Sequence, residues 1–256
     1  NSESLSSQIV ELYLISIKKF FNERTKLYYF DGELIVGDEI SKSTKKMLDN
    51  ITDCTVVDNE DQIIPLFENI YNIYADRKNK GKGNVQSNVF IIIKHIQWID
   101  VLNRIFLGQQ VEVNNVNIIN EFSNDELFSF VPFEEEVHEN DLTDLFDSFE
   151  QEISNQYITG TDTGANIRAK ILELISYGYM YGIHFVLTAN DYTSVKDYMY
   201  DVISKFNERV IFDLNDNDAD RFIPEMKVQT LPDNIAVYTN GINKTYQFKP
   251  FTYLNE

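Results

Sequence analysis

The chain has almost no cysteine, little histidine and no long apolar run. Its 256 residues include one cysteine, Cys54, and three histidines. A single cysteine excludes an internal disulfide framework and a cysteine-rich metal site, and it predicts a reducing compartment such as the cytoplasm. His95, His138 and His184 are too far apart in the sequence to predict a metal site. No apolar run approaches the roughly 20 residues that span a bilayer, and we interpret the start, NSESLSS, as a cut point within a larger protein without a signal peptide.

Positive charge is also scarce. Lys and Arg number 22 against 41 Asp and Glu, a formal net charge of −19. Nucleic-acid binding draws most of its affinity from Lys and Arg that neutralise phosphates, so we expect no nucleic-acid partner. The one dense basic cluster lies in RKNKGKGN (77–84), which is typical of a solvated connector and could alternatively bind an anion.

Residues 105–167 contain no Lys or Arg but 14 Asp and Glu. Glu134, Glu135 and Glu136 follow one another, and Phe130 and Phe133 lie within the four residues before them. Such a stretch is ordinarily a solvated surface layer, and the alternative is a dedicated docking surface. Our candidate for a substrate-docking surface is residues 121–152, which include all five of these side chains.

Helical and strand patterns alternate along most of the chain. Apolar spacing predicts helices over 5–21, 42–48, 60–76, 165–179 and 195–206, a short helix or turn over 99–106, and strands over 26–30, 52–57, 89–93, 183–189 and 209–214. Asn240-Gly241 between alternating residues 234–239 and 244–248 predicts a hairpin. This order predicts an α/β fold, a mainly parallel sheet flanked by helices and finished by an antiparallel hairpin. No repeat or second composition appears, so we expect a single domain over 1–256.

The most apolar strand is Val89–Ile93, and the two residues after it bear on function. Five consecutive apolar residues are typical of a central parallel strand that is buried on both faces. In nucleotide hydrolases of the P-loop kind, such a strand ends in two carboxylates that hold the Mg²⁺ water shell and orient the attacking water. Lys94 and His95 stand at these positions. A lysine ammonium repels a divalent cation, so this pair predicts disabled chemistry, unless the strand simply ends at a polar rim.

Four segments in this order resemble the FtsK/SpoIIIE-type motor ATPases. They are KLYYFDGE (26–33), GYMYGIHFVLTAN (178–190), NERVIFDLNDNDADRFI (207–223) and KTYQFKPF (244–251). The chain is most similar to the degenerate C-terminal ATPase module of the EssC family, the coupling ATPases of type VIIb secretion. In this resemblance Asn190 stands at the polar sensor position and Arg209 at the family's arginine. Asp31-Gly32-Glu33 stands where the family often has Asp-Pro-Lys.

The resemblance implies a P-loop NTPase-like (RecA/FtsK-like) fold in a cytoplasmic domain of a membrane-anchored protein from a Gram-positive bacterium. It implies adjacent ATPase domains in the same chain, a homo-hexamer, and no direct membrane insertion by this domain. The implied role is to recognise or gate secreted WXG-type substrate proteins and to regulate the neighbouring ATPase domains.

The chain departs from that family at its catalytic motifs. It contains no G-x-x-x-x-G-K-[ST] phosphate loop, and GTDTGAN (160–166) mimics the spacing without the lysine. With Lys94 and His95 in place of the carboxylates, we expect no catalytic residue, no metal site and neither ATP nor Mg²⁺ in this domain. One alternative is a working ATP-driven translocase whose phosphate loop lies outside this chain, assisted by Asn190 and Arg209 across a subunit boundary. Another is an unrelated α/β binding domain.

Overall fold

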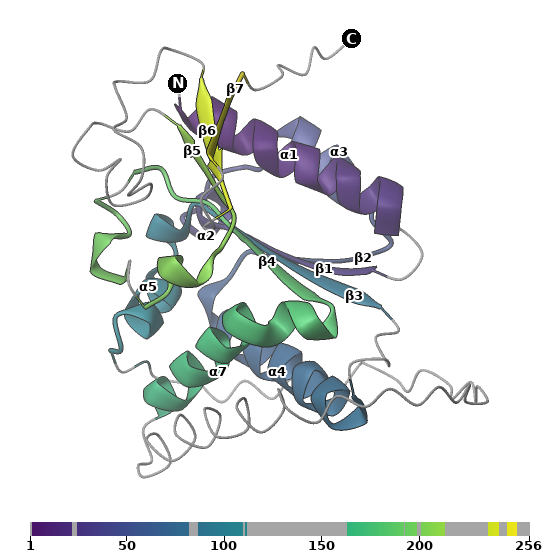
Figure 1. Cartoon of the computed structure of the whole chain (residues 1–256), viewed down its shortest axis with the longest axis vertical. Coiled ribbons are helices and arrows are strands. Elements are labelled where there is room, and N and C mark those ends of the chain that lie inside the picture. Colours follow the sequence, from purple (N-terminus) through teal and green to yellow (C-terminus); the bar gives the residue numbers. More distant parts are fainter. Residues whose placement is uncertain are drawn as a thin grey trace.

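The computed structural model describes residues 2–21, 25–81, 87–109, 111, 163–191, 193–198, 201–212, 235–240 and 245–249. Its centre is a four-stranded, all-parallel sheet in the order β2-β1-β3-β4 (Figure 1). The strands are β1 (Thr25–Asp31), β2 (Asp53–Val57), β3 (Asn88–Lys94) and β4 (Ile183–Leu187). A separate three-stranded antiparallel sheet contains β5 (Arg209–Phe212), β6 (Ala236–Thr239) and β7 (Thr245–Phe248), in that order.

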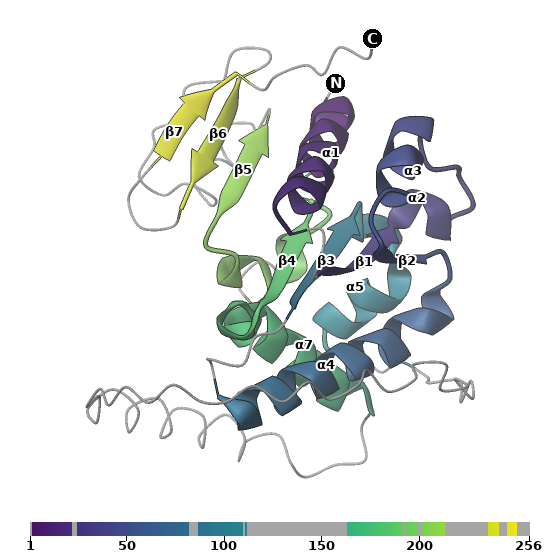
Figure 2. The ribbon, with the colours of Figure 1, turned by 90° about the vertical axis from the view of Figure 1, so that its right-hand side faces the viewer.

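Helices cover both faces of the parallel sheet (Figure 2). One face is covered by α1 (Ser2–Phe21) and α3 (Lys42–Leu48), and the other by α4 (Ile63–Lys80), α5 (Asp100–Phe106) and α7 (Thr163–Tyr177). The remaining short elements are α2 (Gly32–Ile35) and the 3-10 turns η2 (Glu60–Gln62), η4 (Ile96–Trp98), η5 (Gly178–Tyr181), η6 (Lys196–Tyr198) and η7 (Ile203–Lys205). Within the described residues, no helix has both the length and the apolar composition that crossing a membrane requires.

The two faces of the sheet bury alternate residues of the same strands. In β3, Phe90 and Ile92 pack with α1, whereas Ile91 and Ile93 pack with the helices on the opposite face. This alternation follows from the period of two in a strand, and it explains why the strand is apolar throughout. Each fully buried side chain of this size contributes about 1.5–3 kcal/mol relative to an exposed one.

The predicted α/β class, the parallel sheet and the hairpin pairing of β6 with β7 are confirmed. Three predictions were wrong. The hairpin does not finish the parallel sheet, and the strand that begins at Arg209 does not belong to it, because β5 pairs with β6 in a separate antiparallel sheet. The described part of 195–206 forms the short turns η6 and η7 instead of one helix. Its inward residues include Tyr198, Val202 and Ile203, and aromatic and β-branched side chains are poorer helix formers than Ala or Leu.

The strand order places one crevice at the centre of the sheet. The chain passes from β1 outward to β2 and then returns to β3 on the other side of β1. In open parallel sheets, ligands bind outside the carboxyl ends of the strands at such a reversal. The carboxyl ends of β1 and β3, Asp31 and Lys94, are register partners there.

Cys54 in β2 packs against the α1 side of the core. Burial, with smaller contributions from Asp53 and Asp49, raises the pKa of its thiol from 9.0 to about 11. Because the thiolate is the reactive form, we expect iodoacetamide to label the folded chain at pH 8 about 100-fold more slowly than the chain in 8 M urea. Mass spectrometry measures both rates, and equal rates would contradict the packed environment.

Candidate functional site

Four polar side chains gather where β1 and β3 end, and we name Asp31, Glu33, Lys94 and His95 the Lys94 cluster. Asp31 is fully buried, and Lys94 and His95 are 6% and 1% exposed. Asp31 and Lys94 end their strands, and Asp31 also caps α2, because its Oδ1 accepts a hydrogen bond from the Glu33 backbone N–H at 3.0 Å. Strand pairing and the helix cap therefore hold the cluster from two directions.

The ammonium of Lys94 lies between the two carboxylates. Its Nζ donates to Glu33 Oε2 at 2.6 Å and to Asp31 Oδ2 at 3.3 Å. The Tyr29 hydroxyl donates to the same Asp31 oxygen at 3.0 Å. Burial, followed by the nearby Asp31 charge, raises the pKa of Tyr29 far above its usual value, so this hydroxyl remains a donor. The buried Asp31 carboxylate thus has three donors, as a charge in a dry environment requires.

His95 completes the cluster with a strained backbone. Among the described residues, His95 is the one non-glycine residue with a positive φ, and its value of 54° lies in the left-handed region. This backbone conformation costs roughly 1–3 kcal/mol. Its N–H donates to the Thr188 hydroxyl at 3.0 Å. Its ring Nδ1 lies 3.5 Å from Glu33 Oε1, and the ring packs on Trp98 with centroids 4.9 Å apart. The structure therefore holds the imidazole against the carboxylates.

Gly32 is required by this arrangement. A Cβ atom at this position would lie 2.5 Å from the His95 carbonyl oxygen and 2.9 Å from Trp98 Cβ. Both are closer than real contacts, and the first neighbour is backbone that cannot rotate away. The glycine between Asp31 and Glu33 therefore lets α2 approach the turn after β3.

The cluster contains side chains of the types that bind metal cations, but the Lys94 ammonium already binds two of them. Oxygens of Asp31 and Glu33 and a ring nitrogen of His95 all lie within 4.8 Å of one another. Carboxylates and imidazole are common ligands of divalent metals. The Lys94 ammonium binds both carboxylates, so these three residues could hold a metal only after that ammonium had moved away.

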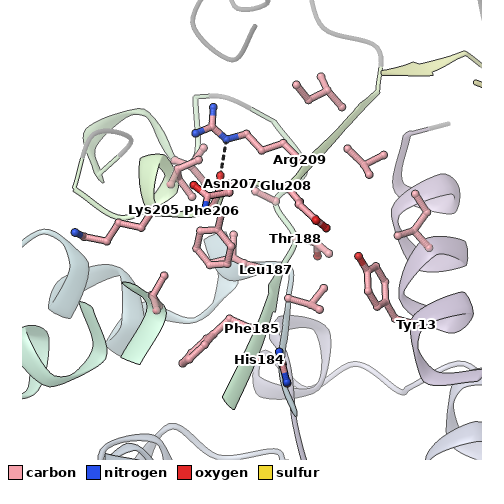
Figure 3. A pocket seen from close by; sticks show the side chains of 18 of the residues that line it. Tyr13, His184, Phe185, Leu187, Thr188, Lys205, Phe206, Asn207, Glu208 and Arg209 are labelled. Atoms are coloured by element: carbon pink, nitrogen blue, oxygen red, sulfur yellow. Dashed lines mark hydrogen bonds between the residues drawn. The ribbon is translucent and has the colours of Figure 1, made fainter. Parts of the chain in front are cut away.

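A second feature lies along the edges of β4 and β5, and we name it the β4–β5 groove. It is a cavity of about 570 Å³ lined by both strands and by part of α1 (Figure 3). Asn190, beyond the end of β4, and Arg209, at the start of β5, both line it. The Arg209 Nε donates to the Phe206 carbonyl oxygen at 3.0 Å, and burial lowers the pKa of its guanidinium. Thr188 also lines this groove, and its hydroxyl accepts the hydrogen bond from the His95 N–H. This hydrogen bond connects the groove to the Lys94 cluster.

The structure thus brings Asn190 and Arg209 into one cavity and places Lys94 and His95 in the neighbouring cluster. The candidate docking residues Phe130, Phe133, Glu134, Glu135 and Glu136 lie outside the described residues. Sequence reasoning did not assign Asp31 and Glu33 to the site. Part of the signal was present, because a lysine at the end of a buried strand needs a carboxylate partner and Asp-Gly-Glu ends another predicted strand. The register of β1 and β3 is what places the two together.

Comparison of the chain with protein-family models, curated proteins and solved structures finds no match.

The buried ion pair between Lys94 and Asp31 generates a stability prediction. Lys94→Met leaves Asp31 buried beside Glu33 without a countercharge, so we expect it to lower the free energy of unfolding by about 3–5 kcal/mol. Asp31→Asn is also destabilising, and the double variant should lose at least about 1 kcal/mol less than the sum of the two. Urea unfolding measures all three variants.

A surface pair is the matched control. Lys80 Nζ lies 2.8 Å from Asp76 Oδ2, but the two side chains are 62% and 58% exposed. Lys80→Met should change stability by less than about 1 kcal/mol. Equal losses for Lys94→Met and Lys80→Met would show that burial of the cluster contributes nothing.

Proposed function

We propose that the chain is a degenerate ATPase-fold module of the FtsK/SpoIIIE type from a type VII secretion motor. In this proposal it recognises secreted WXG-type substrate proteins and regulates adjacent ATPase domains, without hydrolysing ATP itself. The observation that carries the proposal is the Lys94 ammonium, which is bound to Asp31 and Glu33 at the carboxyl end of the central strand.

Electrostatics opposes a catalytic metal beside this ammonium. With an effective dielectric constant of about 20, an ammonium and a divalent cation about 4 Å apart repel each other by about 8 kcal/mol. That is comparable to the whole binding free energy of a micromolar site, about 8 kcal/mol. Phosphoryl transfer in P-loop enzymes depends on Mg²⁺ to neutralise charge on the phosphates. The ammonium therefore supports a role without hydrolysis.

The pattern of substitutions supports the family assignment. The family often has lysine at the position of Glu33 and has a carboxylate at the position of Lys94. In this chain the two charges have exchanged places, and the Lys94 Nζ donates to Glu33 Oε2 at 2.6 Å. The Glu33 carboxylate at the start of α2 therefore binds the ammonium at the end of β3, and the position that would carry a metal-facing carboxylate carries Lys94 instead.

A regulatory role is supported by the contact between the cluster and the groove. Thr188 follows β4, lines the groove, and accepts the His95 N–H. A partner that moved this segment would act directly on the turn after β3. The proposal also includes a membrane-anchored parent, a cytoplasmic location and a homo-hexamer, and the net charge of −19 supports proteins over nucleic acid as partners.

The second candidate is an active ATP-driven translocase. The observation that favours it is that Asn190 and Arg209 line one cavity near the carboxyl end of β4, where both could face a nucleotide. Under this candidate, the phosphate loop comes from outside the chain.

Calorimetry with Mg-ATP separates the two candidates. For the degenerate module we expect no binding heat at micromolar concentrations and no phosphate release above the buffer rate. The reason is the absent phosphate loop together with the ammonium at the metal position. Micromolar binding accompanied by turnover would overturn the proposal in favour of the translocase.

Removal of the ammonium should expose a latent metal site. We expect Lys94→Met to bind Mn²⁺ through Asp31, Glu33 and His95, whereas the unaltered chain does not, because neutral Met ends the repulsion. Electron paramagnetic resonance of free Mn²⁺ measures binding, and circular dichroism confirms that the variant is folded. Lys94→Met with Glu33→Gln is the control and should lose the metal. Equal Mn²⁺ binding with and without Lys94 would contradict the electrostatic argument.

A further inference from the structure

The β4–β5 groove follows a strand edge and not a sheet face. All five residues of β4 and all four residues of β5 line it. Alternate residues of β4 belong to opposite faces of the sheet, since Val186 packs with the α1 side of the core and Phe185 and Leu187 pack with the other side. A cavity that touches both sets must lie beside the strand (Figure 3).

The backbone of β4 turns hydrogen-bonding groups toward this cavity. Thr188 donates its N–H to the Ile93 carbonyl at 2.8 Å, and its own carbonyl accepts from the Ile96 N–H at 3.0 Å. Thr188 therefore faces β3, and because successive residues of a strand alternate, Phe185 and Leu187 direct their N–H and C=O groups away from β3. Among the described strands, β4 pairs with β3 alone. These two residues thus present an edge without a strand partner.

A second strand edge, that of β5, also lines the groove. Among the described strands, β5 ends the antiparallel sheet and pairs with β6 alone. The edge strands of two sheets therefore line one cavity (Figure 3). An extended strand is the structure whose backbone satisfies such an edge, as in recognition by strand addition.

We propose that the β4–β5 groove binds an extended, apolar peptide segment of a partner protein, which pairs with the edge of β4 as an added strand. The five residues of β4 offer roughly 16 Å of edge at about 3.3 Å per residue. The added strand continues the order β2-β1-β3-β4 by one position. This inference deepens the proposed function, because it states the form in which a substrate or partner segment is held.

The charged side chains that line the groove indicate the net charge of the peptide that fits it. Its lining contains two anionic side chains, Asp191 and Glu208, and two cationic ones, Lys205 and Arg209, in a chain whose net charge is −19. The groove is thus electrically balanced, whereas the chain as a whole would attract a basic segment. A segment without net charge fits best, and apolar alternation suits Phe185, Leu187 and Ile211 on the walls. Tyr13 and Tyr238 add aromatic contacts, which often dominate peptide binding.

A selected peptide tests the proposal on the unaltered chain. A phage library of random 12-residue peptides is selected on the protein, and an enriched peptide is synthesised with fluorescein for polarisation measurements. Amide exchange followed by nuclear magnetic resonance is then compared with and without the peptide. We expect exchange at Phe185 and Leu187 to slow at least tenfold on binding, whereas the amides of His184 and Val186, which face β3, change little. This pattern is specific to an added strand.

Two variants at one position provide the matched comparison. Leu187→Pro removes the N–H that faces the groove, and proline is tolerated on a strand edge, whereas Leu187→Ala removes only the side chain. We expect the proline variant to bind the peptide about tenfold more weakly than the alanine variant, because it lacks one more hydrogen bond. If the proline variant does not fold, the amide exchange pattern of the unaltered chain decides whether the peptide binds as an added strand.

Several results would overturn the inference. They are a selection without enrichment, unchanged exchange at Phe185 and Leu187, a peptide bound as a helix, or a groove filled by another segment of the same protein. Each of these differs from failure of the proposed function, which is decided by Mg-ATP turnover. Strand addition without ATP binding supports both proposals, and strand addition with ATP turnover keeps the groove and rejects the degenerate module.

Discussion

The ion pair between Lys94 and Asp31 is the constraint on which the centre of this molecule depends. A carboxylate without exposure at the end of β1 is tolerable only with a countercharge and hydrogen-bond donors, and Lys94, Tyr29 and the Glu33 N–H supply them. The same contacts determine where α2 begins. They also bring Glu33 to His95, so strand pairing, a helix cap and the polar cluster form one connected unit.

This unit occupies the place where parallel sheets usually bind ligands. In this chain, the Lys94 ammonium lies at that place and offsets part of the negative charge of Asp31 and Glu33. The positive φ of His95 and the close approach of Gly32 fix the geometry of this cluster. Thr188 accepts the His95 N–H and also lines the β4–β5 groove, so it connects the cluster to the groove.

Much of the fold could be predicted because buried parallel strands are continuous apolar runs. The strands at 26–30 and 89–93 were located almost to the residue. The carboxyl end of the second one correctly placed Lys94 and His95 at the end of a buried strand. The partner of Lys94 is 63 residues away in the sequence, and only strand register shows that Asp31 lies beside it. The sheet to which Arg209 belongs was mispredicted for the same reason, since strand pairing is a long-range property. The β4–β5 groove could not be predicted, because a strand pattern does not reveal which edge stays open.

The edge of β4 that has no partner among the described strands also has a consequence for how copies of this chain behave in concentrated solution. Exposed strand edges invite edge-to-edge association, and natural sheets counter this with charge or cover. Here the large negative charge of the whole chain keeps copies apart by mutual repulsion. Solutions should therefore stay clear near neutral pH and low salt, and become turbid as acidification removes that repulsion.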